Sequence, residues 1–337
     1  MSVIIRHHTW ISLLFSFKVS IVHVIWFRLV ILFSFSTLLT ILYYEIDNYH
    51  YLANYTNIYD YIGTVTLPTI DFLPASIIGF IIALYLGFAN TSAYDRWWEA
   101  RKLWGSLVNV TRSLARQVSV LLNDYEVIDP SLKQEEVIKE IQKGLIKGII
   151  AFVYLFKNSL RHTNDNKKEL ESYLTFEEIS YLINQYNKPN GLLLILEKKL
   201  ILAYKKNYIN TYFYNLLSQQ LVELTNILGA CERINNTPLP IPYKVLVNRL
   251  VVIFCYTLPF SLIKTSGVFT PFVVFLLGYT LLGLAALIDE LEMPFGYESN
   301  DLPLNAIART IEINLLQVLG ENDLPSFLTP DRDGVLH

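Results

Sequence analysis

Three bulky apolar residues lie four positions apart in one uncharged stretch of the chain: Phe80, Leu84 and Phe88. This spacing places their side chains on one face of a helix, and the same face continues to Thr91 and Asp95. Apolar side chains that meet around an axis form a dry constriction that ions cross only with a penalty, whereas a ring of carboxylates favours cations. The pattern fits an ion pathway with Asp95 at its mouth. A stripe facing lipid or a protein core would have the same period.

The stripe belongs to a segment that is long enough to cross a membrane. The 23 residues from Phe72 to Tyr94 carry no formal charge, and at about 1.5 Å per residue they span a hydrocarbon core of about 30 Å. A second column of this segment, Gly79, Ala83 and Gly87, consists of small residues. Small residues at this spacing let another helix approach closely. A membrane-spanning helix is therefore expected here.

Three further segments are apolar enough to span a membrane, so four spans are predicted. The other three are 23–44, 245–262 and 268–288, and the last two form a helical hairpin. Of the 27 lysine and arginine residues, 21 lie within 95–250 and none within 46–70. Because positive residues are enriched in cytoplasmic loops, both termini and the central region are predicted to be cytoplasmic. A multi-pass protein of the cell (inner) membrane is expected, surrounded by membrane lipid.

The remaining patterns are helical, so the fold class is predicted to be an all-α membrane protein with a helical cytosolic region. Apolar residues recur at helical spacing within 137–156 and 216–234. Thr175 and Glu178 form the sequence pattern of a capping box. The predicted parts are the N-terminal segment with spans one and two (1–94), the cytosolic helical region (95–244), spans three and four (245–290) and a cytosolic C-terminal segment (291–337). The tryptophans next to Asp95 are expected at the membrane interface; they are Trp97, Trp98 and Trp104.

Composition excludes several functions. The chain of 337 residues is 53% hydrophobic and 17% charged, below the roughly 25% of charged residues that soluble domains carry. A net charge of −3 without a basic, aromatic-interleaved patch gives no support for a nucleic-acid partner. No phosphate-binding glycine loop, nucleophile elbow or metal-binding HExxH motif is present. We therefore expect no enzyme activity and no cofactor.

Five acidic residues follow the fourth span, and a solvated acidic segment is the favoured interpretation of them. They are Asp289, Glu290, Glu292, Glu298 and Asp301. Carboxylate oxygens bind hard cations such as calcium, but the spacing does not match an EF-hand loop. No metal site is therefore predicted with these residues, and Glu298 and Asp301 are kept as weak calcium candidates.

Several longer motifs resemble those of the bestrophin family, in its prokaryotic branch. They occur in the family's order over nearly the whole chain: YLGFAN (85–90), YDRWWEARKLWGSLVNVTRSLARQ (94–117), GACERINNTPLPIPY (229–243), EMPFG (292–296) and DLPLNAIARTIEINLL (301–316). The resemblance implies a homopentameric ion channel with four membrane helices per subunit and one central pore. It also implies that the second span lines a narrow hydrophobic neck, at Phe80, Leu84 and Phe88, and that the 301–337 segment wraps over neighbouring subunits.

The resemblance further implies a second constriction on a cytosolic helix, which a loose alignment places near Tyr212. In animal bestrophins a run of consecutive acidic residues after the PFG motif forms a calcium clasp. Here the corresponding segment is YESND, with only Glu298 and Asp301, so calcium activation is not expected.

The predicted function is passive conduction of chloride or other small inorganic anions. A monovalent cation (sodium) channel of the same fold is a close alternative, because Asp95 would form a carboxylate ring unless its neighbour Arg96 neutralises it. A secondary transporter is the second alternative, but this class usually shows repeated halves and a midplane ionisable site. The chain has no internal repeat, and its second span has no charge.

Overall fold

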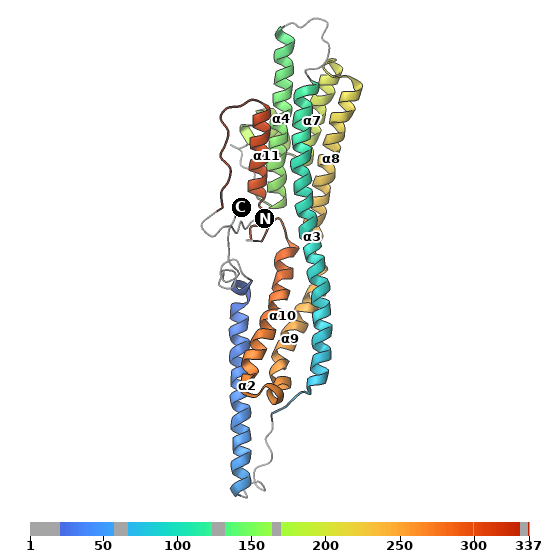
Figure 1. The fold of residues 1–337 in the computed structure, drawn as a ribbon. Helices are drawn as coiled ribbons and strands as arrows, with labels where there is room; N and C mark the ends of the chain where they lie inside the picture. Colours follow the sequence, from blue (N-terminus) through green and yellow to red (C-terminus); the bar gives the residue numbers. More distant parts are fainter. Residues whose placement is uncertain are drawn as a thin grey trace. The chain divides into compact units, whose positions relative to one another are not determined.

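The computed structural model describes residues 21–56, 67–122, 132–163, 170–298, 300–330 and 336. These residues form helices joined by short connections and contain no β-strand, which confirms the all-α prediction (Figure 1). They divide into two compact units. The first contains Arg96–Thr237 and Met293–His337, and the second contains Pro238–Glu292 and the described chain before Arg96.

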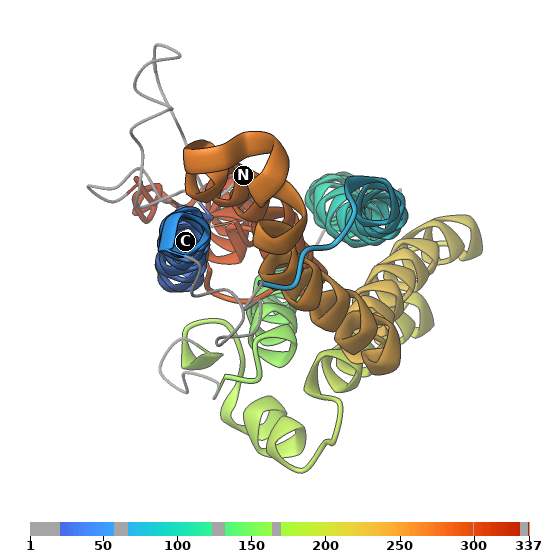
Figure 2. The ribbon, with the colours of Figure 1, turned by 90° about the horizontal axis from the view of Figure 1, so that it is seen from below.

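The second unit is built on three helices that pack against one another, α2 (Val22–Thr56), α9 (Ile241–Ser266) and α10 (Thr270–Glu292). Figure 2 views this group along its helices. Their core is apolar and includes Ile25, Val251 and Val274. The short 3₁₀ helix η2 (Gly267–Phe269) joins α9 to α10, so these helices form the predicted hairpin.

Three segments are long and apolar enough to cross a membrane: Val22–Asp47, Phe72–Leu121 and Ile241–Glu292. The third contains both α9 and α10, so the four predicted spans fall within these segments. The helices are longer than the predicted spans. The N-terminal residues 1–20 and the loop residues 57–66 lie outside the described part of the chain.

Helix α3 (Phe72–Leu121) is one continuous helix of 50 residues, although the sequence predicted a span ending at Tyr94. The charged cluster after Tyr94 contains no proline, and its apolar residues keep the helical period. Ala100, Trp104 and Leu107 are completely buried on one side of the helix. The cluster therefore continues the helix as an amphipathic segment.

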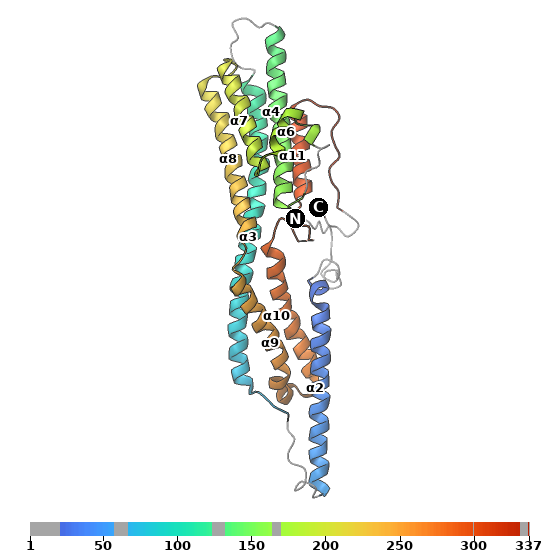
Figure 3. The ribbon, with the colours of Figure 1, turned by 180° about the vertical axis from the view of Figure 1, so that it is seen from behind.

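The described part of the first unit contains the C-terminal part of α3 together with a group of further helices (Figure 3). They are α4 (Leu132–Leu160), α6 (Phe176–Ile183), α7 (Lys188–Lys205), α8 (Thr211–Asn236) and α11 (Leu304–Val318). Helix α4 packs against α7 and α11, and α7 packs against α8 and α6. The helices predicted within 137–156 and 216–234 are confirmed as parts of α4 and α8. The sequence did not predict α7 or α11.

The capping box that begins α6 is also confirmed. The Glu178 N–H donates to Thr175 Oγ1 at 3.3 Å, and the Thr175 N–H donates to Glu178 Oε2 at 2.9 Å. These two bonds satisfy backbone donors that have no partner within the helix.

The interfacial position predicted for Trp104 is wrong. Its side chain is completely buried in the core of the first unit, and its ring stacks on Phe156 of α4 with 5.4 Å between the ring centroids. Trp97 is partly buried, and its Nε1–H donates to the Asn300 carbonyl at 3.0 Å. Trp104 and Trp97 therefore serve the packing of this unit, whereas Trp98 is 46% exposed.

A buried carboxylate connects α11 to the rest of the first unit. Glu312 is only 4% exposed, and its oxygens accept hydrogen bonds from the hydroxyls of Tyr154, at 2.7 Å, and Tyr173. Arg309, one turn earlier on the same helix, forms an ion pair with it at 3.1 Å. Buried charges are tolerated when they are paired and hydrogen-bonded in this way.

Candidate functional site

The stripe of Phe80, Leu84 and Phe88 lies on a face of α3 that is exposed in the described part of the chain. These side chains are 71%, 48% and 62% exposed. Ile82 and Leu86 face the core of the second unit and are buried. The stripe therefore does not pack into the core of this unit. A pore, a second copy of the chain or lipid remains as its surroundings.

Exposure alone does not separate a pore from lipid, because other apolar residues of this part of α3 are exposed too. Ile77 and Ile78 are about half exposed. Two residues in the column of small residues, Gly79 and Gly87, also differ in their surroundings. A Cβ added at Gly79 would lie 2.8 Å from the Phe254 ring of α9, whereas one at Gly87 would meet nothing within 4 Å. Close helix packing thus occurs at Gly79, and the surface near Gly87 is open.

Two polar contacts hold this part of α3 against the α9–α10 hairpin. The Asn90 side-chain amide donates to the Leu284 carbonyl of α10 at 3.3 Å and to the Leu86 carbonyl of its own helix at 3.0 Å. The Tyr243 hydroxyl of α9 donates to the Tyr85 carbonyl at 3.4 Å. These contacts hold α3 to the hairpin, while the stripe lies on an exposed face of α3.

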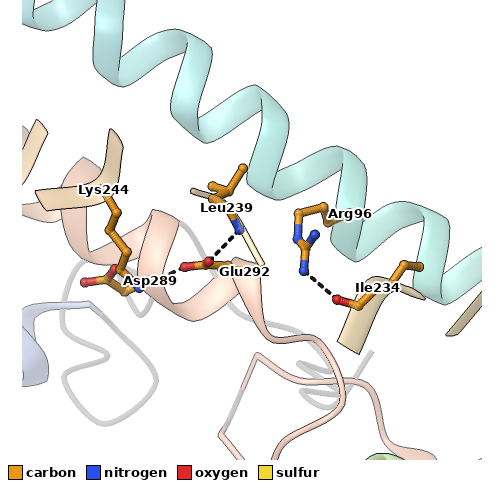
Figure 4. Close-up of polar contacts among 6 residues, drawn as sticks. All are labelled: Arg96, Ile234, Leu239, Lys244, Asp289 and Glu292. Atoms are coloured by element: carbon orange, nitrogen blue, oxygen red, sulfur yellow. Dashed lines mark hydrogen bonds and ion pairs between the residues drawn. The ribbon is translucent and has the colours of Figure 1, made fainter. Parts of the chain in front are cut away.

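Asp95 is exposed at the end of the same face, as the sequence predicted for a pore mouth, and its role there stays a prediction. Its carboxylate makes no hydrogen bond or ion pair with the described residues. The guanidinium of its neighbour Arg96 donates instead to the Thr237 carbonyl, at 2.6 Å, and to the Ile234 carbonyl, at 2.7 Å, the second of which Figure 4 shows. Arg96 thus binds the C-terminal end of α8, where free helix carbonyls carry negative partial charge.

Tyr212 lies in the first turn of α8 and is 72% exposed. The Asn210 side chain caps this helix by accepting from the Phe213 N–H at 2.8 Å. The cap fixes the helix start, so Tyr212 projects from an ordered element. Its assignment to a second constriction stays a prediction.

The interpretation of the acidic segment as solvated is wrong for Glu292, which is 3% exposed. Its Oε1 accepts the Leu239 N–H at 2.9 Å, and its Oε2 accepts Lys244 Nζ at 2.8 Å. Lys244 also forms an ion pair with Asp289, at 2.8 Å (Figure 4). The sequence did not predict this cluster, which fastens the end of α10 to the start of α9.

The two calcium candidates differ in their surroundings. Asp301 is 3% exposed, so the solvated interpretation is wrong for it too, and its Oδ2 accepts the Glu298 N–H at 2.7 Å. The Glu298 side chain is exposed. Among the described residues, no group of three or more histidine, cysteine, aspartate or glutamate side chains is arranged to hold a metal ion. Asp301 thus has a structural role in this turn.

An arginine organises the same turn. Arg161 donates to the carbonyls of Phe295, at 3.1 Å, and Leu302, at 3.4 Å, and it stacks over the Tyr297 ring. Burial lowers the pKa of Arg161, and the nearby Tyr297 and Asp301 oppose this shift. The segment after the PFG motif is therefore held by a partly buried cation.

Comparison with known proteins identifies the family. A family model described as Bacterial/Fungal Bestrophin protein matches residues 1–317. The chain therefore belongs to the bacterial and fungal bestrophin family, which confirms the resemblance found in the sequence.

Curated relatives carry functional names. A voltage-dependent anion channel-forming protein of Salmonella typhimurium is 36% identical over 259 residues, which cover 77% of this chain and 80% of the relative. A protein of the same description from Nostoc is 31% identical over 307 residues, which cover 91% of this chain and 90% of the relative.

A solved structure shows the same fold. The crystal structure of a bacterial bestrophin homolog from Klebsiella pneumoniae matches with a TM-score of 0.75 and 31% identity, over 89% of this chain and all of the other. The all-helical membrane fold predicted from the sequence is thus that of a solved relative.

Proposed function

We propose that this protein is a bestrophin-type channel that conducts chloride or other small anions passively through a single central pore. The observation that carries the proposal is that relatives covering most of the chain are named voltage-dependent anion channel-forming proteins. Their names describe channels rather than enzymes. In the proposed homopentamer, the exposed stripe of Phe80, Leu84 and Phe88 faces the pore axis and forms its neck.

Flux measurement on the reconstituted full-length protein tests this function. In liposomes we expect passive chloride flux that follows the electrochemical gradient and needs no second substrate, because a channel only lowers the barrier to an ion. Chloride and sodium gradients imposed separately identify the ion that is carried. Flux that requires a co-substrate would show coupled transport instead and would contradict the proposal.

One observation favours the cation alternative, namely the exposed and unpaired Asp95 carboxylate. Five copies around an axis would form a negative ring that attracts cations, and Arg96 is bound to the carbonyls of α8. We therefore expect Asp95→Asn to move the reversal potential under a salt gradient toward greater anion permeability. Glu45→Gln is the matched control, because it removes an exposed charge from α2 and leaves α3 unchanged. An unchanged reversal potential in a conducting Asp95→Asn channel would place Asp95 away from the pathway.

We place both chain termini and residues 95–244 on the cytoplasmic side of the cell membrane. The concentration of 21 lysine and arginine residues within 95–250, against none within 46–70, supports this orientation. In this arrangement α9 and α10 cross the membrane and return, so the end of α10 and the start of α9 lie on the cytoplasmic side.

A further inference from the structure

An open groove in the second unit lies between α2, α9 and α10 and has a volume of about 470 Å³. Two arginines line it, Arg28 from α2 and Arg249 from α9, together with the Asn248 amide. Its walls are otherwise mostly apolar and include Val252 and Leu282. A recess with cationic and amide donors above apolar walls matches an amphiphile with a polar, negative head.

The two arginines have no partner among the residues that the structure describes. Neither guanidinium makes a hydrogen bond or an ion pair with any of these residues. Asp289 is the carboxylate among the described residues that line the groove, and it forms an ion pair with Lys244 at 2.8 Å. The groove therefore presents two guanidinium groups that pair with no carboxylate among the described residues, and planar guanidinium groups bind phosphate oxygens through two parallel hydrogen bonds.

Arg28 is unusual because of its place in a membrane helix. It is the only formally charged residue from Val22 to Tyr44. A charged residue within a membrane segment is costly and usually has a specific partner. Its neighbours Trp26 and Phe27 are more than half exposed, as is typical of aromatic residues at the membrane interface. The groove thus lies at the depth of lipid headgroups.

We propose that Arg28 and Arg249 bind the headgroup phosphate of an anionic phospholipid in this groove. Positive residues are enriched on the cytoplasmic side, and this enrichment explains a single arginine near a helix end. It does not explain why two helices far apart in the sequence each place an arginine in the same groove. Basic pockets between membrane helices on the cytoplasmic side bind anionic lipid headgroups. The inference does not depend on which ion the protein conducts.

Native mass spectrometry of the full-length protein in detergent tests the proposal on the unaltered chain. Phosphatidylglycerol and phosphatidylcholine with the same acyl chains are titrated separately. Phosphatidylglycerol is expected to bind more tightly, because both lipids carry a phosphate but only the first has a net negative charge. Equal affinity for the two lipids would overturn the proposal without any substitution.

The double variant Arg28→Gln/Arg249→Gln tests the site itself. We expect its affinity for phosphatidylglycerol to fall about 25-fold, since each arginine near an anionic lipid contributes about fivefold. Arg28→Lys/Arg249→Lys keeps both positive charges but loses the planar guanidinium groups and their paired donors. A smaller loss of affinity for phosphatidylglycerol is therefore expected from this variant. Lys264→Gln, an exposed charge near the opposite end of α9, is the matched control and should bind like the unaltered chain. Equal losses in the control and the Gln variant would overturn the site.

Inorganic phosphate separates a lipid from a free anion. Millimolar phosphate should leave bound phosphatidylglycerol in place, because the apolar walls hold the acyl chains as well as the head. Complete displacement by phosphate would identify a small-anion site and would overturn the assignment to a lipid.

Discussion

Leu84→Ala is expected to raise ion flux severalfold while the oligomer stays intact. Leu84 is the middle residue of the proposed neck, so truncating it in every subunit widens and wets the driest part of the pathway. Its side chain is 48% exposed within the subunit, so the loss of stability should stay below the ~2–5 kcal/mol typical of a leucine truncated in a protein core. Liposome flux combined with size-exclusion chromatography measures both quantities.

Ile78→Ala is the matched control for this experiment. Ile78 is 50% exposed on the same helix, but it lies about 120° around the helix from Leu84. Its truncation removes similar apolar bulk from a face outside the proposed neck, so flux should not change. Similar flux changes in both variants, or none in either, would contradict the assignment of the stripe to the pore.

Glu312→Ala is expected to destabilise the first unit strongly. The change leaves the hydroxyls of Tyr154 and Tyr173 and the Arg309 guanidinium without their buried acceptor. Removing one partner of a buried charged network typically costs about 3–5 kcal/mol. A clearly lower melting temperature, followed by tryptophan fluorescence, is the expected result.

Glu321→Ala serves as the control for charge removal in the same unit. Glu321 forms an ion pair with Lys143 at 3.1 Å, and both side chains are well exposed. Solvent screens such a pair, so its loss should hardly change the melting temperature. If both variants melted alike, Glu312 would not have the structural role that its contacts indicate.

Local patterns were sufficient to predict much of the fold. The period of apolar residues predicted the helices within 137–156 and 216–234, and a four-residue pattern predicted the cap at Thr175. Both features depend on neighbours along the chain. The order and spacing of longer motifs predicted the family, and with it the neck at Phe80, Leu84 and Phe88.

The features that the sequence did not predict depend on distant partners. Glu312 meets Tyr154 and Tyr173, which are 158 and 139 residues away, and nothing near Glu312 indicates that it is buried. Trp104 follows a membrane segment closely, as tryptophans at the membrane interface do. Only its contact with the distant Phe156 shows that it lies in a core. Helix α7 was missed because the run Leu192–Leu196 is apolar throughout and has no polar face to mark its period.

The cluster of Lys244, Asp289 and Glu292 acts as a clasp that closes the α9–α10 pair at one end. At the other end, Gly267 makes the turn with a φ of +54°, and a Cβ there would lie 3.0 Å from the Tyr44 hydroxyl. A pair of helices joined by a tight turn and clasped at its free ends cannot slide lengthwise by even one residue without breaking the ion pairs. The α9–α10 pair should therefore move as one body, and motions that change the width of the proposed neck should occur where α3 packs against this pair.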